Sequence, residues 1–558
     1  MRQHLNNYWG CPQVIVIILM ISNSINSHGQ ERAIGTLPLV NNGALVTESA
    51  NNLNDTEDYE NVEKIYNNLV NARGDFRYPV PRLFLNDREQ YGAYIDYNTN
   101  EITLEKKALD VCMKHGDEAI AFMLGHELTH YYEKHAWKGT FAKENSDLTI
   151  GSTLGAIDTK VIQETEADYL GGFLAYTAGY GMFEKSDEII KDLYKTYNLS
   201  DSMAGYPILT DRIKLSERTT KKLAALIDVF EMANYLLAAD RTAETYALYD
   251  YILKFYQSNK LYNNLGTIAV NDAIKLFKPH QLKFKYVSEL DINFNGSRDT
   301  ETPIDEQINA FLDNAIHQFN AAINLDPSYA PAYLNKANAY ALKREWTKAK
   351  FYLDEEALPI AQKFAKKYKK TLDDITILQG IIAAETGDRA TAKTKFESLF
   401  QTSRLAEQNL RALNGEEIYV SSTTRSIKNT DSIGGMTIAK FLLDKPANLE
   451  KSIGINSDIT FHQYSPENGD YKIFYIDKKQ GRRKLRMIMI YPTENYEGST
   501  SKSIKIGSTV DEVIVAYGNP ISEIETTEGQ LLTYENLFFI TANNKVLKWI
   551  NYGTTVIR

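Results

Sequence analysis

Two histidines, His126 and His130, stand four positions apart in the order H-E-x-x-H, with Glu127 directly after the first. Residues four apart lie on the same face of a helix, so both imidazole rings can reach one metal ion. Zinc is the metal that such motifs usually hold, and it makes a bound water acidic near neutral pH. Glu127 is close enough to take a proton from that water without being a ligand. The pattern therefore predicts a zinc-dependent hydrolytic site.

A tetrahedral catalytic zinc site uses three protein ligands and one water, so two imidazoles leave it one ligand short. Glu164 follows His130 by 34 residues, and Asp168 follows Glu164 by four positions within a second helical pattern. The two carboxylates share a helix face, so Glu164 can complete a set of two histidines and one glutamate. Asp168 is then placed to accept a hydrogen bond from a ligand histidine, which orients its ring.

The elements that must hold these side chains are two helices, which the sequence pattern predicts over residues 117–137 and 160–177. Two short strands are predicted over residues 92–97 and 101–104, separated by turn-forming asparagines. The sequence therefore predicts an α+β domain over residues 55–220. The strand at 92–97 is a candidate edge strand that adds an extended substrate to the sheet. Packing within the sheet is an equally good interpretation of it.

The run G-H-E-L-T-H-Y-Y-E-K-H, followed by E-T-E-A-D-Y-L-G and A-G-Y, resembles the zinc metallopeptidase family that contains HtpX, the CAAX prenyl endopeptidases and the periplasmic BepA-type peptidases. The resemblance implies a zincin-like fold. It implies that His126, His130 and Glu164 are the zinc ligands, that Glu127 is the general base and that Asp168 orients a ligand. These positions match the family pattern without departure.

One departure concerns the His-Pro-x-x-x-x-Arg stretch that is common in this family, because Tyr206 stands here in place of the histidine and Arg212 closes the run. A resting state in which that histidine blocks the zinc is therefore in doubt. Arg212 either faces the cleft or pairs with a carboxylate, and the second role is favoured. His135 lies five residues after His130, about 140° round a continuous helix. It is therefore interpreted as a helix-end histidine and not as a ligand.

Beyond residue 225 the pattern becomes helical, and a repeat of 34 residues relates Ala315 to Ala349 and Phe319 to Leu353. This period resembles the tetratricopeptide repeat, which predicts an all-α solenoid over residues 225–415. Stacked helical hairpins form a curved solenoid with a concave face, which typically binds a peptide or a partner protein. An ordinary helical domain is the alternative.

An insertion interrupts the repeats near residues 279–303. Residues 291–296 of the insertion copy the start of a calcium-binding loop. Thr302, however, occupies the twelfth position, where such a loop needs a glutamate. Calcium binding is therefore a weak hypothesis.

The C-terminal part, residues 416–558, changes to alternating strand patterns such as residues 471–476 and 484–491, which predicts a second α+β domain. Within it, a G-x-(S/T)-x-x-x-V pattern at residues 507–513 is followed by G-N-P at residues 518–520 and then by strand patterns. That order resembles the small outer-membrane lipoprotein BamE and related domains.

The N-terminal residues have the layout of a secretory signal peptide, because an apolar run at residues 14–21 is followed by small polar residues. The run is too short to span a bilayer comfortably, since a spanning helix needs about 20 apolar residues. We expect cleavage near Gly29, a linker over residues 30–54 and a periplasmic or secreted protein. An uncleaved anchor is the alternative. After cleavage Cys112 is the only cysteine, so no internal disulfide is possible.

The chain has 558 residues, 43% hydrophobic and 24% charged, a composition that indicates several folded domains. A formal net charge of −10 argues against a nucleic-acid partner. No segment after the signal approaches the length of a membrane span. The expected fold class is therefore multidomain: an α+β peptidase domain, an all-α repeat solenoid and a C-terminal α+β domain.

Together these features predict an exported zinc endopeptidase that cleaves protein or peptide substrates. The family resemblance implies quality control in a bacterial envelope, with the repeats engaging clients or outer-membrane assembly proteins. The alternative is a repeat-containing chaperone or scaffold in which proteolysis is occasional or latent.

Overall fold

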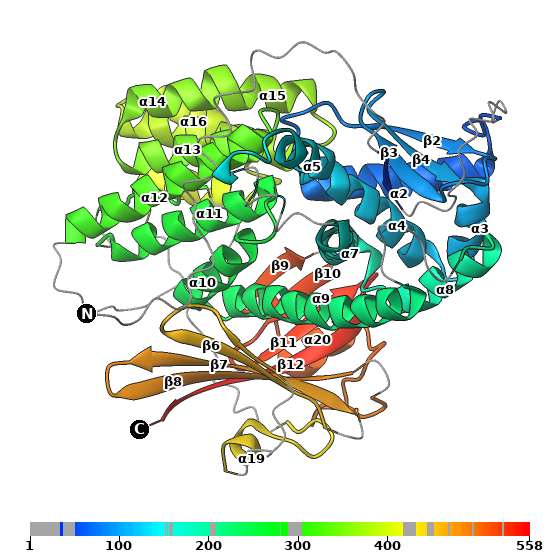
Figure 1. Ribbon diagram of the computed structural model, residues 1–558. Coiled ribbons are helices and arrows are strands. Elements are labelled where there is room, and N and C mark those ends of the chain that lie inside the picture. Colours follow the sequence, from blue (N-terminus) through cyan, green and yellow to red (C-terminus); the bar gives the residue numbers. More distant parts are fainter. Residues whose placement is uncertain are drawn as a thin grey trace, which may run out of the picture.

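The protein is described from a computed structural model. The described residues are 34–36, 51–150, 152, 155, 160–200, 208–278, 281–287, 304–416, 431–443, 451–466, 469–493, 496–526 and 529–557. The predicted signal peptide, the candidate calcium loop and Tyr206 lie outside them. The described part is mostly helical, with a small mixed sheet and a C-terminal antiparallel sheet (Figure 1), which confirms the coarse prediction of fold class.

The first sheet has four strands among the described residues. They are β1 (Ile34–Thr36), β2 (Arg82–Asn86), β3 (Ala93–Asp96) and β4 (Glu101–Glu105), in the order β1-β3-β4-β2. The strands β3 and β4 fall where the sequence predicts them, and β2, which pairs parallel with β4, was not predicted. The neighbours of β3 are antiparallel.

The β1 pairing corrects two expectations. Residues 34–36 lie in the predicted linker, but they form a strand on β3, with Gly35 opposite Ile95. The strand β3 therefore lies inside the sheet, so the edge-strand interpretation of residues 92–97 is wrong and the equally weighted alternative, packing within the sheet, is confirmed. A short segment can pair here because β3 offers a free row of backbone donors and acceptors once β4 has filled its other side.

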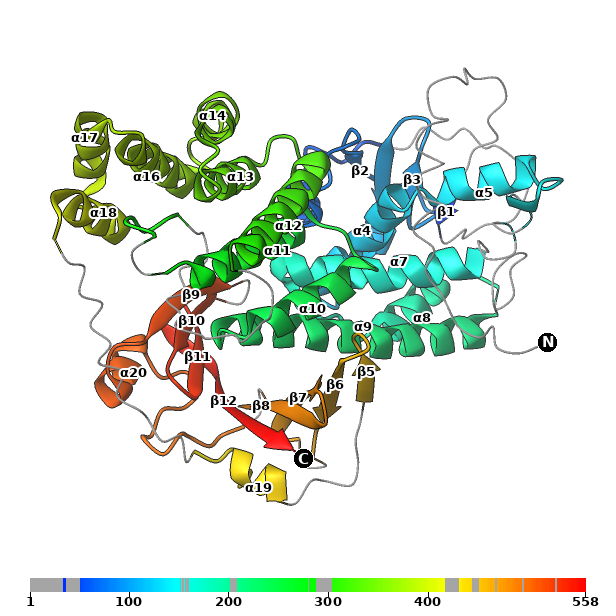
Figure 2. The ribbon, with the colours of Figure 1, turned by 90° about the vertical axis from the view of Figure 1, so that its left-hand side faces the viewer.

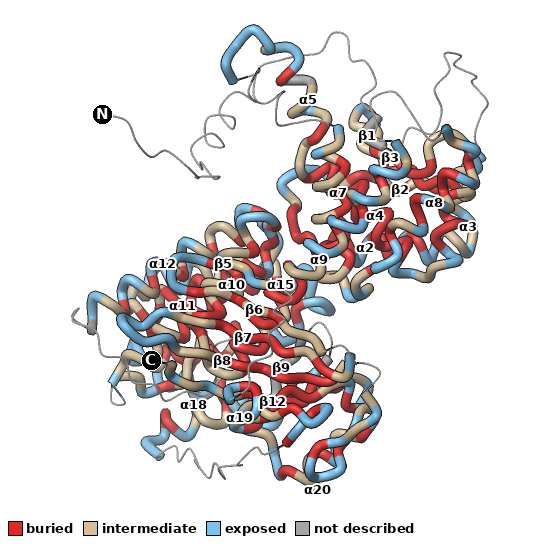
Figure 3. Tube along the Cα trace, turned by 60° about the horizontal axis from the view of Figure 1, so that its bottom comes forward, coloured by how far each residue is buried: buried red, intermediate tan, exposed pale blue. Residues whose placement is uncertain are grey.

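Helices cover this sheet and carry the H-E-x-x-H motif. They are α2 (Glu57–Arg73), α3 (Lys106–Met113), α4 (Asp117–Tyr132), α5 (His135–Glu144), α7 (Lys160–Ala175), the π-helical turn η1 (Tyr176–Tyr180) and α8 (Ser186–Thr196). Nearly all of α4 is buried, and so is most of α7 from Ala167 onward, whereas the first residues of α7 are partly exposed (Figure 3). Burial on all sides is why the apolar residues of α4 do not form a single stripe.

The single helix predicted over residues 117–137 is wrong, because the chain turns at Lys134 and begins α5 at His135. Lys134 adopts a left-handed backbone conformation with φ of 57°. This conformation is costly for a residue with a Cβ. The lysine ammonium lies 3.8 Å from the ring centre of Tyr78 and 4.2 Å from that of Tyr131, contacts that favour this position of the chain.

Two glycines let α4 and α7 cross in backbone contact. A Cβ on Gly125 would come within 2.6 Å of the carbonyl oxygen of Gly171, and a Cβ on Gly171 would come equally close to the backbone of Gly125. No other residue fits at either position without moving a helix. This crossing places the motif on α4 beside the acidic face of α7.

The middle of the chain forms helical hairpins. The helices are α9 (Leu209–Ala238), α10 (Thr242–Leu253), α11 (Asn259–Leu276), α12 (Ile304–Leu325), α13 (Ala330–Leu342), α14 (Trp346–Lys350), the π-helical η2 (Phe351–Ala357), α15 (Leu358–Lys363), α16 (Lys369–Glu385), α17 (Arg389–Leu399) and α18 (Arg404–Asn414). The stretch that begins with η2 continues into α15 and ends at Lys363, and α16 begins at Lys369.

The same packing recurs in two hairpins. A Cβ on Gly266 of α11 would come within 2.4 Å of the Phe319 ring on α12, and a Cβ on Gly380 of α16 within 2.6 Å of the Phe396 ring on α17. In each case a glycine on the first helix makes room for an aromatic ring on the second. The recurrence supports the repeat interpretation by geometry and not only by spacing.

The expected boundary near residue 220 falls inside α9, which runs without a break from Leu209 to Ala238. One hydrophobic cluster includes Leu124 of α4, Phe173 of α7, Leu236 of α9 and Leu265 of α11. The motif-bearing part and the first hairpins therefore share a core. Figure 2 shows α9 running below α7.

The C-terminal sheet has eight antiparallel strands among the described residues, in the order β5-β6-β7-β8-β12-β11-β10-β9. Their bounds are β5 (Lys451–Gly454), β6 (Ile459–Tyr464), β7 (Tyr471–Gln480), β8 (Arg483–Pro492), β9 (Ser522–Thr526), β10 (Gly529–Thr533), β11 (Leu537–Ala542) and β12 (Lys545–Ile557), and the helices are α19 (Ile438–Leu443) and α20 (Val510–Tyr517).

The central strands of this sheet are buried on both faces along much of their length. One face packs against the cluster that contains α9 and α10, through side chains such as Tyr491. The other face packs with α19 and α20, through side chains such as Trp549. Burial on both sides explains why the central strands are nearly continuous apolar runs. Helix α20 begins at the Thr509 capping box and ends before Gly518, close to the expected position.

Among the described residues, no helix has the length and hydropathy needed to cross a membrane.

Candidate metal centre

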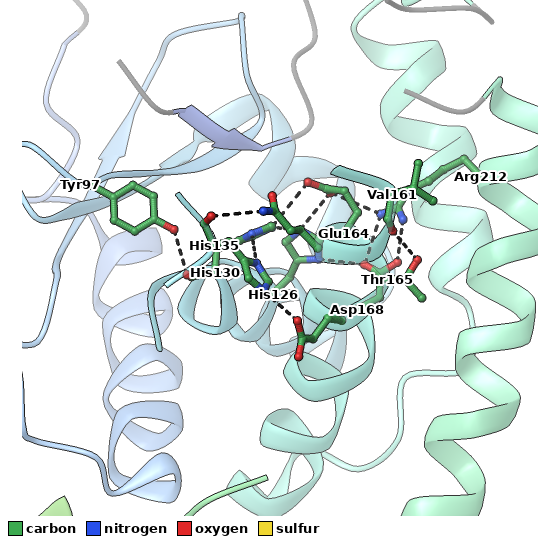
Figure 4. Close-up of polar contacts among 11 residues, drawn as sticks. Tyr97, His126, His130, His135, Val161, Glu164, Thr165, Asp168 and Arg212 are labelled. Atoms are coloured by element: carbon green, nitrogen blue, oxygen red, sulfur yellow. Dashed lines mark hydrogen bonds and ion pairs between the residues drawn. The ribbon is translucent and has the colours of Figure 1, made fainter. Parts of the chain in front are cut away.

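Three buried side chains from α4 and α7 converge on one point (Figure 4). The Nε2 atoms of His126 and His130 are 3.0 Å apart. Glu164 places Oε2 3.5 Å from the first Nε2 and Oε1 3.7 Å from the second. Two nitrogen ligands on one tetrahedral metal ion lie roughly 3.3 Å apart, from bond lengths of about 2.0–2.1 Å. The group can therefore hold a metal ion.

His126 is oriented by a carboxylate that an arginine holds in turn. Its Nδ1 lies 2.8 Å from Oδ1 of Asp168, and Nη1 of Arg212 lies 3.0 Å from Oδ2. Burial alone would raise the pKa of Asp168, but the charge of Arg212 and the hydrogen bond with His126 outweigh burial and lower it. An ionised Asp168 accepts a proton from Nδ1, which leaves Nε2 of His126 free to bind a metal.

His130 is oriented by a second histidine. Its Nδ1 lies 2.7 Å from Nδ1 of His135, whose Nε2 lies 3.1 Å from Oε2 of Glu166. If Glu166 accepts a proton from His135, then His135 accepts one from His130, and Nε2 of His130 is left as the ligand atom. The hydrogen bond from His135 helps to lower the pKa of Glu166 against the effect of burial, so an ionised acceptor is expected.

Glu127 lies next to the convergence point but is not part of it. It is 2% exposed, and its Oε2 has no hydrogen-bond partner among the described residues. Burial raises the pKa of Glu127 to about 8, although the neighbouring His126 and a hydrogen bond from the Ile95 amide act in the opposite direction. Burial therefore favours the protonated form of this carboxyl group.

The structure brings together six of the seven residues that the sequence selected, which are His126, Glu127, His130, Glu164, Asp168 and Arg212. Tyr206, the seventh, lies outside the described residues. Arg212 is buried and paired with Asp168, so its side chain is a support for the ligand set.

Sequence reasoning missed His135, Glu166 and Tyr97. His135 was placed on the wrong face because α4 was expected to continue through Lys134. Glu166 lies between Glu164 and Asp168, but nothing in the spacing pairs it with His135. The hydroxyl of Tyr97 donates to the backbone carbonyl of His130 at 2.9 Å and so ties the end of β3 to α4.

The donor set suits a metal ion on chemical grounds. Two imidazole nitrogens and one carboxylate face each other in a buried site, and Oε2 of Glu164 has no hydrogen-bond partner among the described residues. Buried polar atoms are rarely left without a partner, and a cation satisfies such an oxygen. Cys112 is buried elsewhere in the core and is not part of the site.

Comparison with known proteins does not assign this chain to a family. No family model and no curated protein matches this sequence. Solved structures of two monomeric IFIT1 mutants, one with Gppp-AAAA and the other with m7Gppp-AAAA, align at 13% and 12% identity with TM-scores of 0.26. Each alignment covers 55% of this chain and 65% of the IFIT1 chain, which is less than two thirds of it. A TM-score this low carries no conclusion about function.

Proposed function

We propose that this protein is a zinc-dependent endopeptidase. The observation that carries the proposal is the convergence of His126, His130 and Glu164 with Glu127 beside them. Two histidines, one glutamate and an adjacent free carboxyl group make up an open catalytic zinc site. Imidazole and carboxylate also suit iron and other transition metals. Zinc is proposed because the H-E-x-x-H order places the Glu127 carboxyl group beside the ligands as a base.

Bound zinc would supply a Lewis acid that polarises the scissile carbonyl and lowers the pKa of water. The protein supplies the proton transfers. Oε2 of Glu127 accepts the proton of the attacking water and then delivers it to the leaving amine. Asp168 and His135 hold the two ligand rings in the tautomers that present Nε2, and Arg212 keeps Asp168 in place.

How a substrate reaches the site decides whether the proposed peptidase is permanently active or latent. His126, Glu127, His130 and Glu164 are each at most 5% exposed, and β1, which pairs with β3, also lies against the motif helix α4. A peptide reaches Glu127 only after part of this cover moves. This burial favours a site that is latent in the described conformation, as in the alternative of a repeat-containing chaperone or scaffold with occasional proteolysis.

The setting of the activity is also part of the proposal. The signal-like N-terminus and the family resemblance support an exported enzyme of a bacterial envelope that acts in protein quality control. The helical hairpins are proposed to recruit clients or outer-membrane assembly proteins, and the C-terminal sheet is proposed to resemble BamE in its helix-then-strands order.

The direct test replaces Glu127 by glutamine. The Glu127→Gln protein should keep its zinc, measured by elemental analysis after dialysis, because no ligand is changed. Its cleavage of an unfolded protein such as casein should fall about 10²–10⁴-fold, the usual contribution of a general base. The matched control is Glu118→Gln, an exposed carboxylate at the start of the same helix.

Undiminished cleavage by Glu127→Gln would refute the peptidase proposal. If wild-type protein binds zinc and suppresses aggregation of an unfolded client without cutting it, and Glu127→Gln does so equally well, the chaperone alternative is correct. Deleting residues 225–415 is not a usable test, because α9, α10 and α11 share a core with the motif helices.

A further inference from the structure

Side chains of two helices bind the backbone of a segment between α11 and α12 through hydrogen bonds. Residues 281–287, here called the insert segment, belong to no helix or strand. The side chain of Asn409 on α18 accepts the amide of Lys285 through Oδ1 at 2.8 Å and donates to its carbonyl through Nδ2 at 2.9 Å. Nδ2 of Asn338 on α13 donates to the carbonyl of Val287 at 2.7 Å. The region lies beside α18 in Figure 2.

These contacts imitate the pairing of a strand. Asn409 satisfies both backbone groups of one residue, as a neighbouring strand does, and Asn338 takes the carbonyl two residues further on. Such bonds recognise an extended main chain whatever its sequence is. Both asparagines are almost fully buried, at 0% and 2% exposure. Buried amides are costly unless they are paired, and here their partners are main-chain groups of the insert segment.

Side chains of the insert segment supply the apolar anchors. Phe284 and Val287 are 4% and 1% exposed and belong to the hydrophobic cluster formed by the helices from α13 to α18. The ring centre of Phe284 lies 6.2 Å from that of Phe396 on α17. An aromatic residue and an aliphatic residue three positions later are thus the two side chains that this site buries.

One buried polar atom beside the insert segment has no hydrogen-bond partner among the described residues. This atom is Oδ1 of Asn338. The insert segment uses the donor of this amide but not its acceptor, whereas it uses both atoms of Asn409. A polypeptide that also presented an amide N–H to Oδ1 of Asn338 would satisfy the site more fully than the insert segment does.

We infer that the groove between α13, α17 and α18 is a binding site for an extended polypeptide, and that the insert segment is a tethered occupant which an unfolded client segment replaces. The client segment that fits this groove is extended and carries an aromatic and an aliphatic side chain three residues apart. The inference rests on the proposed function only in assigning the ligand to an unfolded client, since binding in the groove requires no cleavage.

Because the insert segment is tethered next to the groove, it competes with a free peptide and lowers the apparent affinity of that peptide for the groove. A segment on a short linker competes at an effective concentration on the order of millimolar. A free peptide therefore binds the wild-type chain weakly, and weakening the insert segment exposes the affinity of the groove itself. This difference in affinity can be measured.

The test uses the full chain and a fluorescent peptide with the sequence of residues 280–288, followed by anisotropy. Phe284→Ala in the protein should tighten binding of this peptide at least tenfold. Adding Asn409→Asp, which keeps an acceptor but loses the Nδ2 donor, should weaken binding again at least tenfold. Asn309→Asp, an exposed position on α12, is the matched control and should change nothing. A peptide with alanine at its phenylalanine should bind worse than the original.

A second measurement requires no variant. The amide of Lys285 should exchange its hydrogen faster than the slowest core amides of α13, because the segment leaves the groove without unfolding the helices. Equal peptide affinity for wild type and Phe284→Ala would overturn the inference. Loss of the fold in Phe284→Ala, or exchange of the Lys285 amide only with global unfolding, would also overturn it, since either would make the segment a permanent part of the core. Cleavage activity does not enter these readouts, so the peptidase proposal stands or fails separately.

Discussion

At the scale of single residues, the centre depends on how each ligand histidine is held by its second nitrogen. His126 is held by a carboxylate that is itself paired with Arg212, which is a common arrangement for a metal-binding histidine. His130 is held by another histidine, a weaker acceptor that gains its strength from Glu166. The two ligands therefore respond differently to loss of their supports.

His135→Ala should weaken zinc binding about 10–100-fold, because Nδ1 of His130 loses its acceptor and the ring loses its fixed tautomer. Zinc affinity is measured by competition with a coloured chelator, and circular dichroism checks that the helices remain. His317→Ala, which removes an exposed histidine from α12, should leave the affinity unchanged. Equal zinc affinity in His135→Ala and wild type would show that the contact between His130 and His135 does not support the ligand.

At the scale of elements, the crossing of α4 and α7 decides whether a site exists at all. Each helix presents its own pair of polar side chains by local periodicity, but the two pairs meet only where Gly125 and Gly171 allow backbone contact. Tyr97 and Ile95 then attach the sheet to α4 from the other side. The candidate ligands therefore lie on two helices that cross beside one strand, and α5 and α9 supply the supporting side chains His135 and Arg212.

Gly171→Ala should separate α4 from α7 and lower the free energy of unfolding by about 1–3 kcal/mol, because the new methyl group meets backbone atoms that cannot rotate away. Zinc affinity should fall with it, since Glu164 moves away from the histidines. Both quantities are measured, by urea unfolding and by chelator competition.

Gly139→Ala in α5 provides the contrast. The nearest atom to a Cβ there is a side-chain nitrogen of Gln163 at 3.8 Å, an ordinary contact. The change should leave stability unchanged or raise it slightly through helix propensity. If Gly171→Ala behaved like Gly139→Ala, the close crossing would not be what positions the ligands.

At the scale of the whole molecule, α9 connects the three regions. Its first turn carries Arg212 at the metal centre, and its later turns pack against α10 and the C-terminal sheet. A salt bridge of 2.6 Å between Glu244 on α10 and Lys478 on β7 fixes this contact, and Glu244 is 2% exposed. We therefore expect the regions to unfold together.

Lys478→Met should lower the free energy of unfolding by about 1–3 kcal/mol, because the buried carboxylate of Glu244 is left with Arg241 as its remaining charged partner. The loss should appear in one cooperative transition, followed by circular dichroism at helix and sheet wavelengths. Lys484→Met, on the exposed part of β8, is the control and should have little effect. Separate transitions for helix and sheet would contradict a shared core.

The sequence alone determined the features that depend on local backbone geometry. His126 and His130 share a face, as do Glu164 and Asp168, because a helix repeats every 3.6 residues wherever it lies. The 34-residue recurrence likewise indicated helical hairpins, since each unit satisfies its backbone hydrogen bonds within itself. The candidate ligands and the helices that carry them therefore follow from short stretches of sequence.

Only the tertiary structure decided which segments meet. Four features depend on partners that are distant in the sequence. They are the approach of α7 to α4, the left-handed turn at Lys134 that brings His135 to His130, the pairing of β1 with β3, and the position of residues 281–287 between α13 and α18. These arrangements are stabilised by packing and hydrogen bonds between separate segments. The residues next to each one in the sequence do not determine which distant segment will pack there.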